Sequence, residues 1–491
     1  MKRATRAAAS LREGNRLLSM RHFFSSFAIA DQTSGVLWIS VPPVTIQFAM
    51  FLRILPVLLL TVAAPHGEKA NQFEEFVRPY VASNNFSGAV LVEHHGKIIF
   101  QQSYGYSDRD SKHANDNATQ FHIASMSMQY TSAAVLRLIA QQKLTLETTI
   151  GDLLPHTPGA EKITVSDLLL QQSGLDDINS HSDYNGVLQH HQTPTSLVAQ
   201  IDGHSLSFSP GTKHAGEEHS AFNVLALLLE RETGRPFPKA IEDILLRPLN
   251  LNATYADDDR APSPIAAKGY QPTGVADLEP APAIHWSGKA GNASIVTSTT
   301  DELRLIHAIF DGNFLDSQLR GRLLGPLPRV GYGWLRSESK EFGALTYYMN
   351  GRSPGFASYV LHIPREALTV IVFSNIYCSA PSEIGEGLAR IALGRPHEAF
   401  HPLAKAPRPI TRPLLFHFPV EFFQSKAEMT MFSRESDTFL RWPSGDLSPL
   451  IPIGEDEWID RSYWELVRLD RNSNGAPVGL HYDRFRADLV R

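Results

Sequence analysis

The order of strand-like and helix-like segments is the feature that most limits how this chain can fold. Two apolar stretches rich in β-branched residues, Ser87–Glu93 and Lys97–Phe100, flank His95-Gly96 and predict an early β-hairpin. A long middle part with apolar residues at helical spacing follows. Strand-like stretches return only near residue 345. This order favours an α+β unit whose two terminal strand groups share one antiparallel sheet.

The individual elements are expected in the following places. A short amphipathic helix is predicted at 72–78, because Pro79 disfavours its continuation. Further helices are predicted at 125–142, 165–171, 220–233, 299–310 and 382–391, and later strands at 345–348, 359–362 and 368–373. These elements make up a main domain at 70–394. Five prolines mark 395–413 as a linker, and alternating aromatic patterns predict a small β-rich domain at 414–491.

The N-terminal segment has the pattern of an export signal. Residues 54–64 form an uncharged apolar run after Arg53, with small residues at its end. Met50 opens a compact signal peptide at 50–64, which leaves 1–49 as a leader upstream of the functional start. A membrane anchor made from 33–64 and an organellar transit peptide are the alternatives. The export interpretation predicts a secreted or periplasmic protein that touches a membrane only through this segment, if it stays uncleaved.

Charge and cysteine content exclude several function classes. The chain carries 45 basic and 51 acidic residues, and its first 64 residues are basic, so residues 65–491 have a net charge of −11. An acidic body argues against nucleic acid as a partner, because phosphate binding needs clustered Lys and Arg. Cys378 is the single cysteine, so no intramolecular disulfide and no Cys-rich zinc site can form. No cofactor is expected.

A set of motifs in fixed order carries a family resemblance. It begins with Phe-His-Ile-Ala-Ser-Met-Ser-Met-Gln-Tyr-Thr-Ser-Ala-Ala at 121–134. The other landmarks lie at 143–146, 150–155, 163–169, 172–175, 208–213, 297–303, 331–334 and 351–356. Over roughly residues 75–393 the chain resembles the serine β-lactamase and D-alanyl-D-alanine carboxypeptidase superfamily, class C branch. The resemblance implies an antiparallel sheet flanked by helices and hydrolysis of amides or esters through an acyl-enzyme.

The resemblance also implies which side chains do the chemistry. Ser125 takes the place of the family's nucleophile. A serine hydroxyl needs a base, and the family supplies a lysine one turn later as S-x-x-K, since residues i and i+3 share a helix face. A Tyr-x-Asn loop gives a second proton carrier. A Lys-Thr-Gly or His-x-Gly strand gives a polar group beside the oxyanion site.

This sequence departs from the family at all three of these places. Met128 stands where the lysine is expected. The Tyr-x-Asn position falls on Glu217, Glu218 and His219, or one residue earlier, so its register is ambiguous by one. The strand motif reads Met349-Asn350-Gly351. A thioether neither accepts a proton at neutral pH nor carries charge.

Three functions remain open at this stage. In the first, the chain is a pseudoenzyme whose cleft, with Met128, Met349, Asn350 and Gly351, binds a small peptide, an ester or a cell-wall-like fragment. In the second, it is an active hydrolase in which Glu217, Glu218 or His219 acts as base for Ser125, or in which Tyr184 reaches the site. In the third, the C-terminal domain carries a partner interaction. Ser125 could also serve only as a helix N-cap.

Several other patterns carry little weight. Ser337–Lys340 fits S-x-x-K, but it is expected in an exposed turn between strands. Gly351–Gly355 fits G-x-S-x-G, but a nucleophile elbow must join a strand to a helix, and here a strand follows a strand. His181 with Asp183 is interpreted as a pair of surface residues rather than a metal site, and Cys378 as a packing residue.

Overall fold

The computed structural model describes residues 66–490, except 213–217, 260–261, 313, 326–329, 405, 407 and 420–426. The leader predicted at 1–49 and the signal peptide predicted at 50–64 lie outside the described residues. Among the helices of the described part, none combines the length and the apolar character that crossing a membrane requires.

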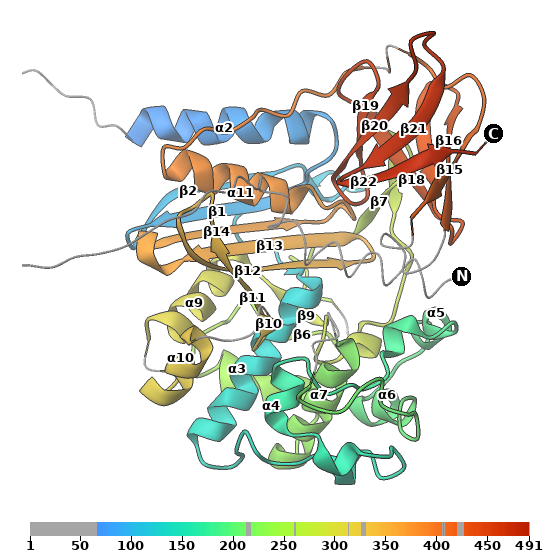
Figure 1. Cartoon of the computed structure of the whole chain (residues 1–491). Helices are drawn as coiled ribbons and strands as arrows, with labels where there is room; N and C mark the ends of the chain where they lie inside the picture. Colours follow the sequence, from blue (N-terminus) through green and yellow to red (C-terminus); the bar gives the residue numbers. More distant parts are fainter. Residues whose placement is uncertain are drawn as a thin grey trace, which may run out of the picture.

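A seven-stranded antiparallel sheet organises the larger part of the chain (Figure 1). Its strand order is β10-β11-β12-β13-β14-β1-β2. The early hairpin joins the late strands because β1 pairs with β14, with Gly88 opposite Ser374. The prediction that the two strand groups share one antiparallel sheet is therefore confirmed. The strands are β1 (Gly88–His94), β2 (Lys97–Tyr104), β10 (Val330–Gly331), β11 (Trp334–Ser339), β12 (Ala344–Ser353), β13 (Phe356–Ile363) and β14 (Leu368–Ser374).

Helices cover both faces of this sheet. Figure 1 shows α2 and α11 on one face and the other helices of the main domain on the opposite side. Buried Phe, Leu, Ile and Val side chains from both layers form one continuous core with the sheet. The helices are α2 (His66–Ala82), α3 (Ser127–Ala140), α4 (Val165–Leu169), α5 (Tyr184–Val187), α6 (Pro194–Ala199), α7 (His219–Thr233), α8 (Phe237–Ile241), α9 (Thr299–Phe310), α10 (Ser317–Leu324) and α11 (Ala380–Ala392).

Short strands and single helical turns connect these elements. The strands are β3 (Tyr106–Asp108), β4 (His113–Ala114), β5 (Phe121–His122), β6 (Tyr255–Ala256), β7 (Tyr270–Pro272), β8 (Leu278–Pro280) and β9 (Ile295–Thr297). The turns are η2 (Ala124–Met126), η3 (Gly151–Leu153), η4 (Ala160–Lys162), η5 (Ile178–Ser180), η6 (Glu242–Leu246), η7 (Trp286–Lys289) and η8 (Pro364–Glu366). Strands β5, β9 and β6 form a small sheet that leads directly into η2.

Two expectations about local structure are wrong. Helix α2 continues through Pro79 to Ala82, although Pro79 was expected to end it. Phe76 and Tyr80, which precede and follow Pro79 in the sequence, pack their aromatic rings against the core. The free energy gained by this burial outweighs the helical hydrogen bond that Pro79 cannot donate. Residues 337–339 belong to strand β11 rather than to an exposed turn, and Ser339 is buried.

The C-terminal part is a closed eight-stranded antiparallel barrel, shown in red in Figure 1. The prediction of a β-rich C-terminal domain is confirmed. Its interior holds large side chains such as Phe416, Met431 and Trp458. The strands are β15 (Leu414–Phe418), β16 (Ala427–Arg434), β17 (Asp437–Arg441), β18 (Leu447–Pro452), β19 (Glu457–Asp460), β20 (Glu465–Arg471), β21 (Pro477–Tyr482) and β22 (Phe485–Leu489).

Arg461 joins the barrel to the main domain. Its side chain is fully buried and donates to the carbonyl oxygens of Asn84 (2.7 Å) and Asp277 (2.8 Å) and to Oδ1 of Asn85 (2.7 Å). Close by, the ring of Trp464 lies 5.5 Å from that of Tyr80 in α2. Because the guanidinium finds acceptors on the other unit, the two units share a well-ordered polar contact.

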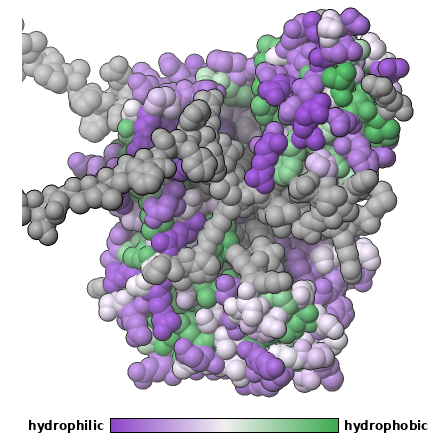
Figure 2. All heavy atoms as spheres, viewed as in Figure 1, coloured by the Kyte–Doolittle hydropathy of each residue, from purple (hydrophilic) through white to green (hydrophobic). Residues whose placement is uncertain are grey.

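In the view of Figure 2, hydrophilic residues prevail on the described surface and hydrophobic ones lie between them. Exposed large hydrophobic side chains come from separate parts of the described chain, such as Ile98, Tyr106, Ile265 and Leu466. Single exposed apolar residues of this kind are normal on a folded protein.

Candidate active site

Ser125 lies on a tight turn between β5 and α3. The turn begins at Ala124, whose φ of 51° is in the left-handed region that alanine rarely adopts. Two hydrogen bonds fix the preceding residue: Ile123 donates to the carbonyl of Ile295 (3.1 Å) and accepts from the hydroxyl of Ser358 (2.7 Å). Backbone strain of this kind persists only where the surroundings enforce it and is frequent at functional sites. Ser125 itself is 7% exposed.

Strand β12 passes directly against this turn at Gly351. A Cβ atom at Gly351 would lie 2.3 Å from the carbonyl oxygen of Ile123 and 2.9 Å from the backbone nitrogen of Ser125. Only glycine permits so close an approach. The structure therefore brings Ser125 and Gly351 together. Backbone amides beside a serine are the groups from which an oxyanion-binding site can be built.

Met128 and Met349 are buried at their expected places in the sequence motifs. Met128 is 0% and Met349 2% exposed, and both belong to the hydrophobic core of the main domain. Met128 follows Ser125 by three residues. Asn350, next to Met349 in β12, is half-buried. Two thioethers at these positions supply neither a base nor a positive charge. Within the described part of the chain, no hydrogen bond reaches the Ser125 hydroxyl.

Glu218 is bonded to a turn that does not include Ser125. Its carboxylate accepts from the hydroxyl of Ser173 (2.8 Å) and from the backbone amides of Ser173 and Gly174 (both 3.1 Å). Burial raises the pKa of Glu218 above its ordinary value, although these hydrogen bonds act in the opposite direction. These hydrogen bonds give Glu218 a role in holding the turn after α4.

His219, another predicted proton carrier, stands at the start of α7. His219 is its first residue, and its Nδ1 lies 3.3 Å from a carboxylate oxygen of Asp177. Glu217 falls within 213–217 and so lies outside the described residues. The roles of Glu217, Glu218 and His219 as bases remain predictions.

A buried amine and a phenol form a pair that the motif analysis did not single out as a unit. Nζ of Lys289 lies 3.4 Å from the hydroxyl of Tyr184, and both residues are buried. The sequence offers Tyr184 as a tyrosine that reaches the site, but the family motifs do not point to Lys289. One signal in the sequence could have revealed it: Lys289 is the only charged residue in the run from Ser287 to Thr300.

Two contacts place this pair beside the elements of the site. Trp286 in η7, the turn that ends at Lys289, stacks on His122 with ring centroids 3.7 Å apart, and His122 precedes Ser125 by three residues. Asn223, one turn after His219 in α7, donates to the carbonyl of Ala290 (2.8 Å). Lys289 thus lies between the approach to Ser125, by which we mean the segment from His122 to Ala124, and the first turns of α7. An amine and a phenol of this kind can exchange a proton.

His122 is held by a buried carboxylate. Its Nε2 lies 2.9 Å from a carboxylate oxygen of Asp257, and both side chains are buried. Burial lowers the pKa of His122 below its ordinary value, against the opposing effect of Asp257. His122 therefore holds the approach to Ser125 in place.

The sheet, the helix that follows Ser125 and the strand beside it together define a serine hydrolase fold of the β-lactamase type. A family model described as Beta-lactamase matches residues 73–393, which is more than half of the chain. The chain belongs to the Beta-lactamase family, as the sequence resemblance implied.

Curated relatives are identical to this chain at about a quarter of the aligned positions. PbpX of Bacillus subtilis (strain 168) is 26% identical over 304 residues, which cover 61% of this chain and 73% of PbpX. Protein flp of Staphylococcus aureus (strain N315) is 25% identical over 332 residues. That match covers 63% of this chain and 64% of Protein flp.

Solved structures confirm the fold. The octameric penicillin-binding protein homologue from Pyrococcus abyssi has a TM-score of 0.60 at 17% identity, covering 85% of this chain and 99% of that one. The part of this chain covered by that structure is therefore longer than residues 73–393, which the family model matches. EstCE1, a hydrolase with promiscuous acyltransferase activity, has a TM-score of 0.54 at 21% identity, covering 63% of this chain and 94% of that one.

Proposed function

We propose that this member of the Beta-lactamase family is catalytically impaired and works as an exported binding protein. One observation carries the proposal: the residue one turn after Ser125 is Met128, a fully buried side chain without a titratable group. Met349 repeats the loss on the neighbouring strand, and Glu218 is bonded elsewhere. General acid–base groups contribute roughly 10²- to 10⁴-fold in rate, so their loss at a retained serine leaves little turnover.

The ligand class follows from what the site keeps. The β12 backbone at Gly351 offers peptide groups, and Asn350 beside it offers an amide. The two methionines make the surroundings apolar. A small peptide, an ester or a cell-wall-like fragment suits such a site, whereas nucleic acid does not suit a body with this negative charge.

Intact mass spectrometry after incubation with an acyl-forming probe tests the proposal. A fluorophosphonate and a penicillin are added to the wild-type protein and to Ser125→Ala. No adduct on a folded wild-type protein is the expected result. A wild-type adduct that disappears in Ser125→Ala would overturn it.

The alternative is an active hydrolase with a different base, and one observation favours it. Lys289 and Tyr184 form a buried amine–phenol pair beside the approach to Ser125. If the wild-type protein is labelled, labelling rates of Lys289→Met, Tyr184→Phe, Glu217→Gln and His219→Ala identify the base. The base variant loses labelling, while the others keep it.

Export is tested separately. The apolar run at 54–64 supports a signal peptide. N-terminal sequencing of protein recovered from its native host would then give a mature start near residue 65. Recovery of the intact N-terminus from the cytoplasmic fraction would overturn the proposed localisation.

A further inference from the structure

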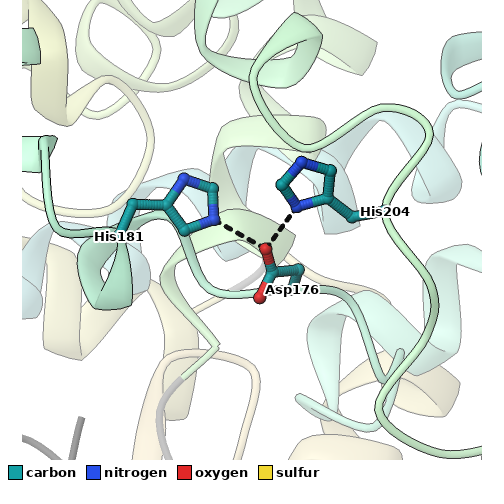
Figure 3. Close-up of side chains that lie close together, drawn as sticks. All are labelled: Asp176, His181 and His204. Carbon is teal, nitrogen blue, oxygen red and sulfur yellow. Dashed lines mark hydrogen bonds and ion pairs between the residues drawn. The ribbon is translucent and has the colours of Figure 1, made fainter.

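Three side chains with metal-binding groups meet outside the candidate active site. Figure 3 shows His181 and His204 pointing at the carboxylate of Asp176 from two sides. Nε2 of His181 and Nδ1 of His204 each lie 2.6 Å from the same oxygen of Asp176. All three candidate ligand atoms lie within 4.8 Å of one another. In the sequence His181 is grouped with Asp183 as a surface residue, but in the structure its partner is Asp176.

The distances suit a metal ion after a small adjustment. Zn²⁺ bonds to imidazole nitrogen and carboxylate oxygen are about 2.0–2.2 Å long, so tetrahedral ligand atoms stand roughly 3.3 Å apart. The two histidine–aspartate distances would have to open by less than about 1 Å. His204 is 48% exposed at its side chain and Asp176 30%, so both have room to turn.

The two loops that carry these residues are already held together. Asp176 and His181 flank η5, whereas His204 follows α6. The backbone amide of Ser207 donates to the carbonyl of Gly174 (2.8 Å), which ties the His204 loop to the Asp176 loop. Asp202, two residues before His204, is bonded to His156 (2.6 Å). A site with fixed backbone needs little ordering when it binds an ion.

The donor set selects the type of ion. Two imidazoles and one carboxylate favour Zn²⁺ and similar divalent transition metals over Mg²⁺ or Ca²⁺, which prefer oxygen ligands. Three protein ligands leave one tetrahedral position for water or another ligand. We propose that Asp176, His181 and His204 form a binding site for a divalent transition-metal ion of the Zn²⁺ class.

The position of the site gives the ion a structural role. It would cross-link the loop after α4 to the loop after α6. Asp177, next to Asp176, contacts His219 at the start of α7. The ion would therefore steady the start of α7. This inference does not depend on whether Ser125 forms an acyl-enzyme.

Equilibrium dialysis against Zn²⁺, with metal content measured on the full chain without a polyhistidine tag, tests the proposal. We expect one Zn²⁺ per wild-type chain at saturation. His204→Ala and Asp176→Asn should each weaken binding by at least about tenfold, because two ligands hold the ion far less well than three. Co²⁺, which reports its coordination by visible absorption, should give a spectrum in the wild type that both variants lack.

A matched variant controls for unspecific histidine binding. His481→Ala removes an imidazole from a single His–Asp pair in the barrel, where Nε2 lies 3.1 Å from Asp470. It should bind Zn²⁺ like the wild type. His204 is half-exposed, so its replacement should leave the metal-free melting temperature unchanged. Equal Zn²⁺ content in the wild type and His204→Ala, or displacement of Zn²⁺ by millimolar Mg²⁺ or Ca²⁺, would overturn the proposal.

Discussion

At the scale of single residues, the site depends on the missing side chain of Gly351. Its neighbours are the carbonyl of Ile123 and the amide of Ser125, which are backbone atoms and cannot turn away. Gly351→Ala should therefore move the Ser125 turn and lower the free energy of unfolding by about 1–3 kcal/mol. Urea unfolding measures this loss. Gly186→Ala in α5 is the control, because a Cβ there meets nothing within 4 Å, and equal stability of the two variants would refute the prediction.

Glu302 gives a prediction about pH. It is fully buried and accepts a hydrogen bond from the hydroxyl of Tyr130 (2.9 Å), while its other oxygen has no partner in the described part of the chain. Burial, with a smaller effect of Asp301, raises the pKa of Glu302 to about 8 from 4.5. The folded protein thus keeps a proton that the unfolded chain releases, and stability falls as pH rises through this window, by roughly 1.4 kcal/mol per pH unit.

Glu302→Gln removes this dependence because its amide stays neutral. The wild type and the variant should have similar unfolding free energies near pH 5, and the variant should be the more stable near pH 8. Urea unfolding at both pH values checks this, and other titrating groups cancel in the difference. A difference between the two proteins that does not change with pH would contradict a raised pKa for Glu302.

At the scale of elements, periodic segments could be predicted and irregular ones could not. The helix at 299–310 has the predicted bounds, because Ser298 caps it and its apolar residues recur regularly. The helix predicted from 125 begins its regular part at Ser127, since Ala124 to Met126 form a tighter turn against β12. Tertiary packing carried α2 past Pro79, which no local rule anticipates.

The candidate site shows the same division. The family motifs predicted that Ser125 and Gly351 belong to one site, and the structure brings them together. The pairs Lys289–Tyr184 and Asp176–His204 join residues that are 105 and 28 positions apart in the sequence. No spacing in the sequence encodes such contacts, so only the folded chain reveals them.

Strand β12 links the site to the barrel through Arg352. Its guanidinium carbon lies 4.3 Å from the ring centroids of both Tyr377 and Tyr463, and the side chain donates to the carbonyl of Ser462 (2.9 Å). Arg352 directly follows Gly351. A double-mutant cycle with Arg352→Met and Tyr463→Leu should give a coupling energy of about 0.5–2 kcal/mol in urea unfolding. Additive effects of the two substitutions would show that the contact couples nothing across the interface.

At the scale of the whole molecule, the barrel and the main domain should unfold together. Arg461 is fully buried, and burial lowers its pKa to about 10, so it stays charged at neutral pH. Its carbonyl and amide acceptors at Asn84, Asn85 and Asp277 all belong to the main domain. Removing the guanidinium leaves these acceptors unpaired at the interface, at a cost of about 3 kcal/mol or more.

Differential scanning calorimetry measures this coupling. We expect one transition for the wild type and two for Arg461→Met, because the interior of the barrel forms a core cluster of its own and melts separately once the contact is lost. Arg461→Lys keeps the charge but not the planar guanidinium, so its melting profile should lie between those of the wild type and Arg461→Met. Arg484→Met, at an exposed position of the barrel, should melt like the wild type. A single unshifted transition in Arg461→Met would mean that apolar packing around Tyr80 and Trp464 alone holds the two units together.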